Sequence, residues 1–188
     1  MNIPLVIQHR HIHLTRTDLR RLFGDEKNLH KDVALKQRGQ FVFKETLAVI
    51  GPRGELTQVK VLGPTRTKTQ VELSASDAAA IGVRTPLRHS GDLKRAGSCK
   101  LKGPEGQILA TSSMIISARH LHCDPKTAKR LKVKNHEIVS LQHTTRDNVR
   151  LNHILVRIHP TFSLELHLNQ DEAAELWLQS GEFFELCS

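Results

Sequence analysis

The sequence Arg-His-Ile-His at residues 10–13 returns as Arg-His-Leu-His at residues 119–122, 109 positions further along a chain of 188 residues. A helix-capping residue follows each copy, Thr15 or Thr17 in the first and Asp124 in the second, and an amphipathic run comes after it. A motif that recurs in the same local context indicates that the chain has two related halves.

Short β-rich runs, bounded by Gly, Pro, Asn or Asp, make up most of the remaining sequence. Tight turns of the pattern Gly-Pro-x-Gly are predicted at residues 51–54 and 103–106. Helices are predicted over residues 74–81 and 169–178, the second with a capping box of Asn169 and Glu172. Strands are predicted at residues 4–8, 41–50, 56–62, 100–102, 107–110, 114–117, 137–143, 154–158 and 164–168. Many short strands with few short helices favour β-barrels over a parallel α/β sheet.

The composition is that of an ordinary globular protein, because 38% of the residues are hydrophobic and 25% are charged. This excludes intrinsic disorder and collagen-like repeats. No stretch approaches the ~20 apolar residues of a membrane-spanning helix, and the N-terminus is too short and too uncharged for a signal peptide. The three cysteines are irregularly spaced, which does not support a disulfide framework. These features predict a cytoplasmic protein without a membrane segment.

The net charge of +9 is compatible with a nucleic-acid surface or with a site for a polyanionic small molecule. Basic residues occur in ones and twos, which is typical of a solvated surface. Aromatic residues make up only 4% of the chain, so few side chains could stack on the bases of a nucleic acid. A small anionic molecule is therefore the first expectation, and nucleic acid is the second.

The histidines of each motif are expected to share one face of a strand, because residues i and i+2 point the same way. His11 and His13 could then bind one metal ion, and His120 and His122 another, at the 2.0–2.1 Å typical of zinc. Strand alternation turns Cys123 away from His122, so we expect Cys123 to be structural.

Each pair needs a further ligand. His167 and Glu72 each lie near the end of a predicted strand, just before a capped helix. A surface histidine and a glutamate favoured by the helix dipole are the alternative interpretations, and spacing alone does not decide between them.

Further motifs follow in a fixed order, and together with the two histidine motifs they resemble the phosphate propanoyltransferase family, the phosphotransacylase type associated with propanediol utilisation. The resemblance extends from about Leu5 to Ala174. It depends on residues 39–41 (Gly-Gln-Phe), 45–46 (Glu-Thr), 51–54 (Gly-Pro-Arg-Gly), 62–66 (Leu-Gly-Pro-Thr-Arg), 70–74 (Gln-Val-Glu-Leu-Ser), 88–92 (Arg-His-Ser-Gly-Asp) and 167–173 (His-Leu-Asn-Gln-Asp-Glu-Ala).

The resemblance implies two similar antiparallel β-barrel domains capped by short α-helices, with the active site between them. The first domain would comprise residues 10–117 and the second residues 118–188, joined by the N-terminal strand 1–9. It implies two divalent metal ions, usually zinc, held by His11, His13 and Glu72 and by His120, His122 and His167. It also implies a phosphate-binding catalytic arginine at Arg66 and coenzyme A contacts at Val6, Ile7, Gln8, Arg53 and Lys60.

The implied reaction is the reversible conversion of an acyl-CoA, propanoyl-CoA or acetyl-CoA, and phosphate into an acyl phosphate and coenzyme A. Since no Ser or Cys lies in an activated-nucleophile motif, we expect phosphate to attack the thioester directly. Two alternatives stay open. A basic nucleic-acid-binding β-barrel would lose affinity steeply with salt, and a di-zinc thioester hydrolase would release thiol without phosphate.

Recognisable sequence begins almost at Met1, which leaves no room for the N-terminal extension that directs some relatives into bacterial microcompartments. A free cytoplasmic bacterial enzyme is therefore expected, and co-assembly into a microcompartment through partners stays open. Near the other end, Trp177, Phe183 and Phe184 are expected either to pack against a barrel or to contact another subunit of a homo-oligomer or a shell.

Overall fold

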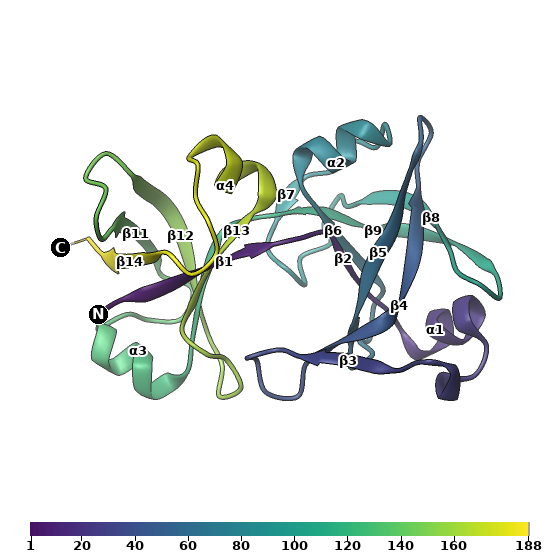
Figure 1. Cartoon of the computed structure of the whole chain (residues 1–188), viewed down its shortest axis with the longest axis horizontal. Helices are drawn as coiled ribbons and strands as arrows, with labels where there is room; N and C mark the ends of the chain where they lie inside the picture. Colours follow the sequence, from purple (N-terminus) through teal and green to yellow (C-terminus); the bar gives the residue numbers. More distant parts are fainter. Residues whose placement is uncertain (188) are drawn as a thin grey trace. The chain divides into compact units, whose positions relative to one another are not determined.

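The computed structural model describes residues 1–187, and the chain divides into two compact units (Figure 1). Unit 1 comprises Met1–Gln8, Lys36–Arg38 and Ala118–Ser188, and unit 2 comprises His9–Leu35 and Gly39–Ser117. Each unit is mainly β, with a few short helices. The mainly β class and the two barrels predicted from the sequence are therefore confirmed.

Unit 2 is built on a ring of six strands. The order around the ring is β4, β5, β2, β6, β9 and β8, and β8 pairs with β4 to close it. Two further short strands extend the sheet, β3 on β4 and β7 on β9. The bounds are β2 (His11–His13), β3 (Lys31–Ala34), β4 (Phe41–Ile50), β5 (Glu55–Gly63), β6 (Gln70–Leu73), β7 (Leu87–Arg88), β8 (Gly97–Lys102) and β9 (Gln107–Ser117).

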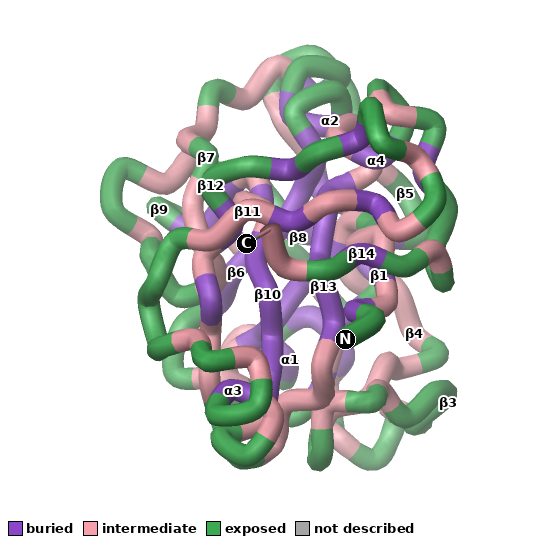
Figure 2. Tube along the Cα trace, turned by 90° about the vertical axis from the view of Figure 1, so that its left-hand side faces the viewer, coloured by how far each residue is buried: buried purple, intermediate pink, exposed green. Residues whose placement is uncertain are grey.

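Unit 1 is a closed barrel of six strands in the order β1, β13, β10, β12, β11 and β14. Two neighbouring strands, β10 and β13, are buried along their whole length (Figure 2). The bounds are β1 (Ile3–Gln8), β10 (His120–Cys123), β11 (Ile138–His143), β12 (Arg150–Ile158), β13 (Glu165–Asn169) and β14 (Phe183–Leu186).

The strand directions correct one expectation, because the barrels are mixed and not purely antiparallel. The parallel pairs are β2 with β5 and β6 with β9 in unit 2, and β10 with β12 and β1 with β13 in unit 1. Parallel neighbours need a crossover connection, and helices lie in the connections from β2 to β5, from β6 to β9 and from β10 to β12. The alternation of residues along a strand does not encode the direction of its neighbour, so the sequence pattern could not reveal this.

The pairing of the two barrels is equivalent strand by strand, and it exposes an exchange of strands between the repeats. β9 directly precedes the motif strand β10 in the chain, but it pairs with β6 in unit 2. β1 directly precedes the motif strand β2, but it pairs with β13 in unit 1. The first strand of each repeat therefore completes the barrel of the other repeat.

The helices begin at the capping residues that the sequence indicates. Thr15 caps α1 (Arg16–Phe23), Ser74 caps α2 (Ala75–Ala80) and Asp124 caps α3 (Pro125–Leu131), each by accepting hydrogen bonds from backbone N–H groups of the first turn. Asn169 and Glu172 form a full capping box at α4 (Gln170–Glu175). A 3-10 turn, η1 (Glu26–Asn28), follows α1.

Each unit has its own hydrophobic core. In unit 2 the buried apolar side chains come from the ring strands and from α1 and α2, and they include Phe23 of α1. In unit 1 they include Phe184 of β14 and Cys123, both fully buried. Phe184 therefore packs within a barrel, whereas Trp177 is 86% exposed. Among residues 1–187, no helix has the length and apolar character needed to cross a membrane.

Candidate metal centres

The two histidine motifs occupy equivalent strands of the two barrels. In unit 2, His11 of β2 lies opposite Glu72 of the antiparallel strand β6, and β5 runs parallel on the other side of β2. In unit 1, His120 of β10 lies opposite His167 of β13, and β12 runs parallel on the other side of β10. The same three-strand arrangement is thus built twice, each time with a third donor side chain facing the histidine pair.

The unit 2 triad consists of His11, His13 and Glu72, all buried. Glu72 Oε1 lies 3.5 Å from His11 Nε2 and 3.7 Å from His13 Nε2. Tetrahedral ligands bonded to zinc at 2.0–2.1 Å are about 3.3–3.4 Å apart. The observed separations are close to two edges of such a site, so these residues fit a divalent metal ion.

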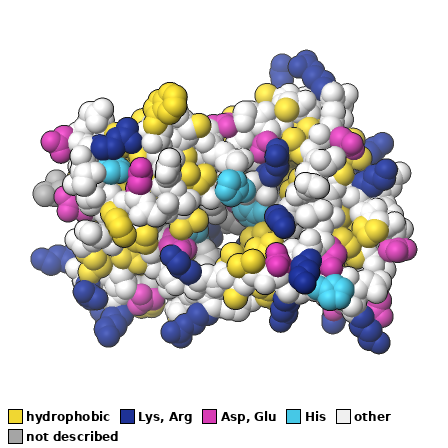
Figure 3. Space-filling view, in the orientation of Figure 1, with side chains coloured by type: hydrophobic (Ala, Val, Ile, Leu, Met, Phe, Trp, Pro, Cys, Tyr) yellow, Lys and Arg dark blue, Asp and Glu magenta, His cyan; other side chains and the backbone are white. Residues whose placement is uncertain are grey.

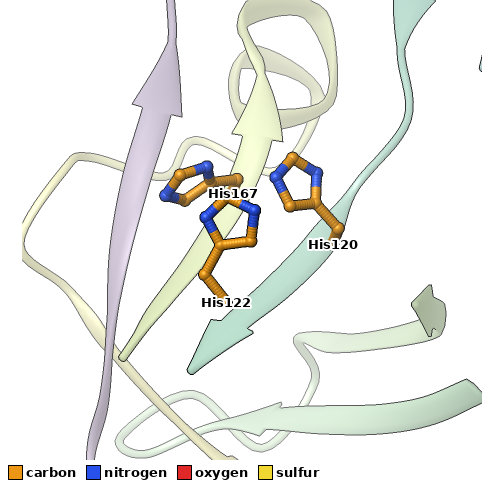
Figure 4. Close-up of side chains that lie close together, drawn as sticks. All are labelled: His120, His122 and His167. Atoms are coloured by element: carbon orange, nitrogen blue, oxygen red, sulfur yellow. The ribbon is translucent and has the colours of Figure 1, made fainter. Parts of the chain in front are cut away.

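The unit 1 triad consists of His120, His122 and His167, whose imidazoles come together from β10 and β13 (Figure 4). Their ring centroids lie 4.5–4.8 Å apart, and all three side chains are buried. Phe162 stacks on the His122 ring at 3.9 Å between centroids. Within residues 1–187, the buried Nδ1 atom of His167 has no hydrogen-bond partner, as expected of a nitrogen kept for a metal.

The first histidine of each motif is oriented by the same hydrogen bond. His11 Nδ1 lies 2.9 Å from the carbonyl oxygen of His9, and His120 Nδ1 lies 2.9 Å from that of Ala118. A carbonyl oxygen only accepts, so Nδ1 carries the proton and Nε2 keeps its lone pair. Such bonds orient metal-binding histidines and fix their tautomer.

Glu72 is held through both carboxylate oxygens. Gln70 Nε2 donates to Oε1 at 2.5 Å, and Ser117 Oγ donates to Oε2 at 2.8 Å. Burial opposes ionisation of Glu72, but the neighbouring His11 outweighs burial, so the pKa of Glu72 lies well below its ordinary value. Glu72 is therefore an ionised carboxylate, which is the form that binds a metal.

Burial and neighbouring charges shift the pKa values of the two unit 2 histidines in opposite directions. Burial lowers the pKa of His11, but the Glu72 carboxylate more than compensates, and the net shift is upward. Burial, together with the charges of His11 and Arg66, holds the pKa of His13 well below its ordinary value. His13 is therefore neutral near pH 7, as a metal ligand must be.

Arg66 is connected to the unit 2 triad through two polar side chains. Arg66 Nη1 donates to Ser90 Oγ at 3.0 Å, and Gln70 Nε2 donates to the same oxygen at 2.8 Å. Gln70 in turn contacts Glu72. A guanidinium half-buried beside a histidine pair is well placed to bind an anion at this centre.

The arginine that begins each motif has a structural partner. Arg10 Nη1 lies 2.6 Å from Asp77 Oδ1, and Arg119 Nε lies 3.5 Å from Glu172 Oε1. Asp77 and Glu172 are in the first turns of α2 and α4, the helices that directly follow β6 and β13. Each arginine therefore ties the histidine strand to the helix after its partner strand.

The residues predicted to contact coenzyme A fall in both units. Val6, Ile7 and Gln8 belong to β1 of unit 1, where Val6 lies opposite His167. In unit 2, the exposed Lys60 lies opposite His11 on β5. Arg53 lines a cavity of about 390 Å³ beside α2, and its aliphatic stem covers Gly82, where even a Cβ atom would clash.

Sequence reasoning missed the side chains that hold the candidate ligands, which are Gln37, Gln70, Ser90, Ser117 and Glu165. A signal was available for Gln70 and Glu165, because each precedes a candidate ligand by two residues on a strand and must share its face. Ser117 is brought to Glu72 by the pairing of β6 with β9. Gln37 contacts His122 Nδ1 at 2.8 Å across 85 residues of sequence, which no local pattern encodes.

The chain is mainly β, with two barrels, and each barrel has a buried triad suited to a divalent metal ion. This fold and these triads define a candidate metal-dependent enzyme. The sequence profile of phosphate propanoyltransferase matches residues 4–179 of the chain. With that match the chain belongs to the phosphate propanoyltransferase family, which confirms the resemblance seen in its motifs, and it is an acyltransferase.

Individual relatives agree with this assignment over nearly the whole chain. The phosphate propanoyltransferase of Thermotoga maritima is 40% identical over 177 residues, covering 94% of this chain and 84% of the relative. That of Rhodopseudomonas palustris is 36% identical over 185 residues, covering 98% and 82%. That of Salmonella typhimurium is 38% identical over 172 residues, covering 91% and 81%.

Proposed function

We propose that the chain transfers a propanoyl or acetyl group reversibly between coenzyme A and phosphate, and that both triads hold metal ions used in this reaction. The observation that carries the proposal is the pair of buried triads in equivalent register, within a chain of the phosphate propanoyltransferase family. Zinc is the metal we favour, since five imidazoles and one carboxylate form a donor set typical of zinc.

In the proposed reaction, a phosphate oxygen forms a bond to the thioester carbonyl carbon and a tetrahedral oxyanion results. The C–S bond then breaks, which releases the acyl phosphate and coenzyme A thiolate, and the thiolate takes up a proton from solvent. Metal ions held by His11, His13 and Glu72 and by His120, His122 and His167 would supply the positive charge that stabilises the oxyanion and the thiolate.

Arg66 is the residue we assign to phosphate. Its planar guanidinium matches two phosphate oxygens, and each charge-assisted hydrogen bond contributes about 1.5–3 kcal/mol. Ser90 accepts a hydrogen bond from one Arg66 nitrogen and so orients the guanidinium.

Coenzyme A carries phosphate groups, which suit the basic side chains of Arg53 and Lys60. Both side chains are exposed, so their charges are available to a ligand. We assign the acyl-CoA chain to the backbone and side chains of Val6, Ile7 and Gln8, on the strand that pairs with the His167 strand.

We infer a direct attack by phosphate, without an acyl-enzyme. Burial raises the pKa of Cys99 to about 12 and that of Cys123 to about 11, so neither thiol is a nucleophile near neutral pH. Mixing the enzyme with labelled acyl-CoA in the absence of phosphate should leave the protein unlabelled after rapid quenching. Isolation of one acyl group per chain would show that the attack is not direct.

Release of coenzyme A thiol from propanoyl-CoA tests the function itself. The assay compares phosphate with phosphate-free buffer, and we expect thiol release and acyl phosphate to appear together only when phosphate is present. Equal thiol release without phosphate would indicate a thioester hydrolase instead.

The cytoplasmic location stays a prediction, which fractionation of cells tests. Assembly into a homo-oligomer and enclosure in a microcompartment are also predictions that stay open.

A further inference from the structure

A cavity of about 600 Å³ lies in unit 1, beside the start of α3. Three segments of the unit line it, and they are Arg38, residues 124–126 at the start of α3, and residues 160–164 after β12. None of the lining residues is a candidate metal ligand, and none has been assigned to phosphate or coenzyme A. The lining residues therefore have no role in the proposed reaction.

Hydrogen bonds hold two of these segments together. The backbone N–H of Arg38 donates to the carbonyl oxygen of Thr161 at 3.0 Å. Ser163 Oγ donates to the carbonyl oxygen of Lys36, also at 3.0 Å. The two segments are thus joined on both sides of Phe162 in the sequence, so a ligand would meet a preformed site and would lose little free energy in ordering it.

The cavity has an excess of positive charge. Arg38 and Lys126 both line it, and within residues 1–187 neither side chain forms an ion pair or a hydrogen bond. Asp124 is the single carboxylate of the lining, but its oxygens accept hydrogen bonds from the backbone N–H groups of Lys126 and Thr127 and from the Thr127 hydroxyl. Two cations are therefore available to an anionic group.

The rest of the lining is mostly apolar, and it consists of Pro125, Pro160, Phe162 and Leu164. Ser163 is the one uncharged polar side chain of the lining, and its hydroxyl proton is already donated to a backbone carbonyl oxygen. Such a surface offers few groups that could recognise the edge of a base or the hydroxyls of a sugar. It suits a short alkyl chain.

We propose that this cavity binds a small anion that carries a short alkyl chain, with the anionic group at Arg38 and Lys126 and the chain against Phe162 and Leu164. Short-chain carboxylates and acyl phosphates share this chemistry. An acyl phosphate is the product of the proposed reaction, and a carboxylate is what its hydrolysis yields. The inference goes beyond the proposed function, because binding in this cavity needs neither a metal ion nor turnover.

Titration of the full-length protein with sodium acetate, propanoate and butanoate tests the chemistry of the ligand, with ¹H–¹⁵N backbone NMR spectra as the readout. We expect the affinity to rise about two- to fourfold with each added methylene, since full burial of one methylene corresponds to about fourfold. Inorganic phosphate and propan-1-ol each lack one half of the ligand and should bind more weakly than propanoate. Equal affinities along the carboxylate series, or for propanoate and inorganic phosphate, would overturn the inference.

The same spectra locate the bound anion. We expect propanoate to shift the amide signals of Lys126, Phe162 and Leu164, and shifts confined to residues outside the lining would overturn the inference. Ethylphosphonate has the same ethyl group as propanoate and distinguishes the two sources of the ligand. Tighter binding of propanoate assigns the cavity to free carboxylates, and tighter binding of ethylphosphonate assigns it to acyl phosphates. Either result supports the shared chemistry.

Substitution of the two cations tests their role. Arg38→Gln and Lys126→Gln should each weaken propanoate binding by about 3–10-fold, because each variant loses one charged contact. Both positions are exposed, so both variants should fold. Lys129→Gln, at an exposed position of α3 outside the lining, and Arg66→Ala should bind propanoate like the wild type. Wild-type affinity in both cavity variants, or loss of binding in Arg66→Ala, would overturn the inference.

Failure of this inference and failure of the proposed function give different results. Phosphate-dependent thiol release from propanoyl-CoA by a chain whose cavity binds no propanoate would overturn the inference alone. Propanoate binding in the cavity of a chain that forms no acyl phosphate would overturn the proposed function and support the inference.

Discussion

Arg66 lies beside the unit 2 triad without belonging to it. Its charge contributes to the low pKa of His13, which shows that the guanidinium is electrostatically close to the ligand pair. Its contact with Ser90 joins it to the hydrogen bonds that hold Glu72. At the scale of single residues, Arg66 and the candidate metal ligand Glu72 are therefore parts of one polar network.

Arg66→Ala should raise the KM for phosphate and lower kcat/KM by about 10–100-fold, because one or two charge-assisted hydrogen bonds to phosphate are lost. Metal content should not change, since Arg66 is not a ligand. Steady-state kinetics with varied phosphate, together with metal analysis, check this. Arg21→Ala, an exposed arginine of α1, is the matched control. Wild-type phosphate kinetics in Arg66→Ala would remove Arg66 from the site.

The cysteines give a prediction that depends on pH. Only thiolates react with alkylating reagents, and burial raises the pKa of Cys99 to about 12 and that of Cys123 to about 11. Both remain protonated thiols at pH 8, while Cys187 is only partly buried. Mass spectrometry after iodoacetamide treatment of the folded protein at pH 8 should find Cys187 alkylated. Rapid labelling of Cys99 or Cys123 would contradict their burial.

The residues that the sequence could reveal are those with a local pattern. The His-x-His spacing predicts two imidazoles on one strand face, and the structure builds both pairs. Glu72 and His167 needed the resemblance, because their approach to the histidines depends on pairing between distant strands. Strand alternation also predicts that Glu165 shares the face of His167. No local sequence pattern, however, distinguishes a buried carboxylate from an exposed one.

At the scale of helices and strands, helix capping shows how much of the fold the local sequence determines. The cap pattern predicts all four α-helices to within a few residues, since N-cap side chains act on their own first turn. The direction of neighbouring strands and the exchange of β1 and β9 between barrels are set by tertiary pairing. Local sequence contains neither.

Thr15 and Thr17 are two candidate caps for α1, and the structure selects Thr15, whose Oγ1 accepts from the Asp18 backbone N–H at 3.0 Å. Thr15→Ala should lower the free energy of unfolding by about 1 kcal/mol. Thr17 is exposed inside the first turn, so Thr17→Ala should change stability by only about 0.5 kcal/mol or less. Urea unfolding of both variants measures this, and an equal loss in the two would argue against the assigned cap.

The exchanged strand β1 is essential to unit 1, because Leu5 is buried and 1% exposed in its core. Leu5→Ala should destabilise the protein by about 2–5 kcal/mol through loss of buried surface and creation of a cavity. Ile138→Thr, at a position 56% exposed in β11, should cost far less. Thermal unfolding compares the two, and similar melting temperatures would contradict the place of β1 in the barrel.

At the scale of the whole molecule, the charge of +9 is distributed over many sites. Lysine and arginine side chains lie in small groups separated by other side chains on the face shown in Figure 3. Such a distribution suits long-range attraction of anionic substrates, and its effect on their association rate falls as salt is added. It provides no continuous basic track on that face for a nucleic-acid backbone.

The two triads are the features on which the whole account depends, and the number of metal ions per chain measures them directly. After dialysis against zinc and removal of the excess, we expect two zinc ions per wild-type chain by mass spectrometry of the metals. His13→Ala and His122→Ala should each retain one, because each removes a ligand from a different triad. Fewer than two zinc ions in the wild-type chain, or two in either variant, would contradict the account.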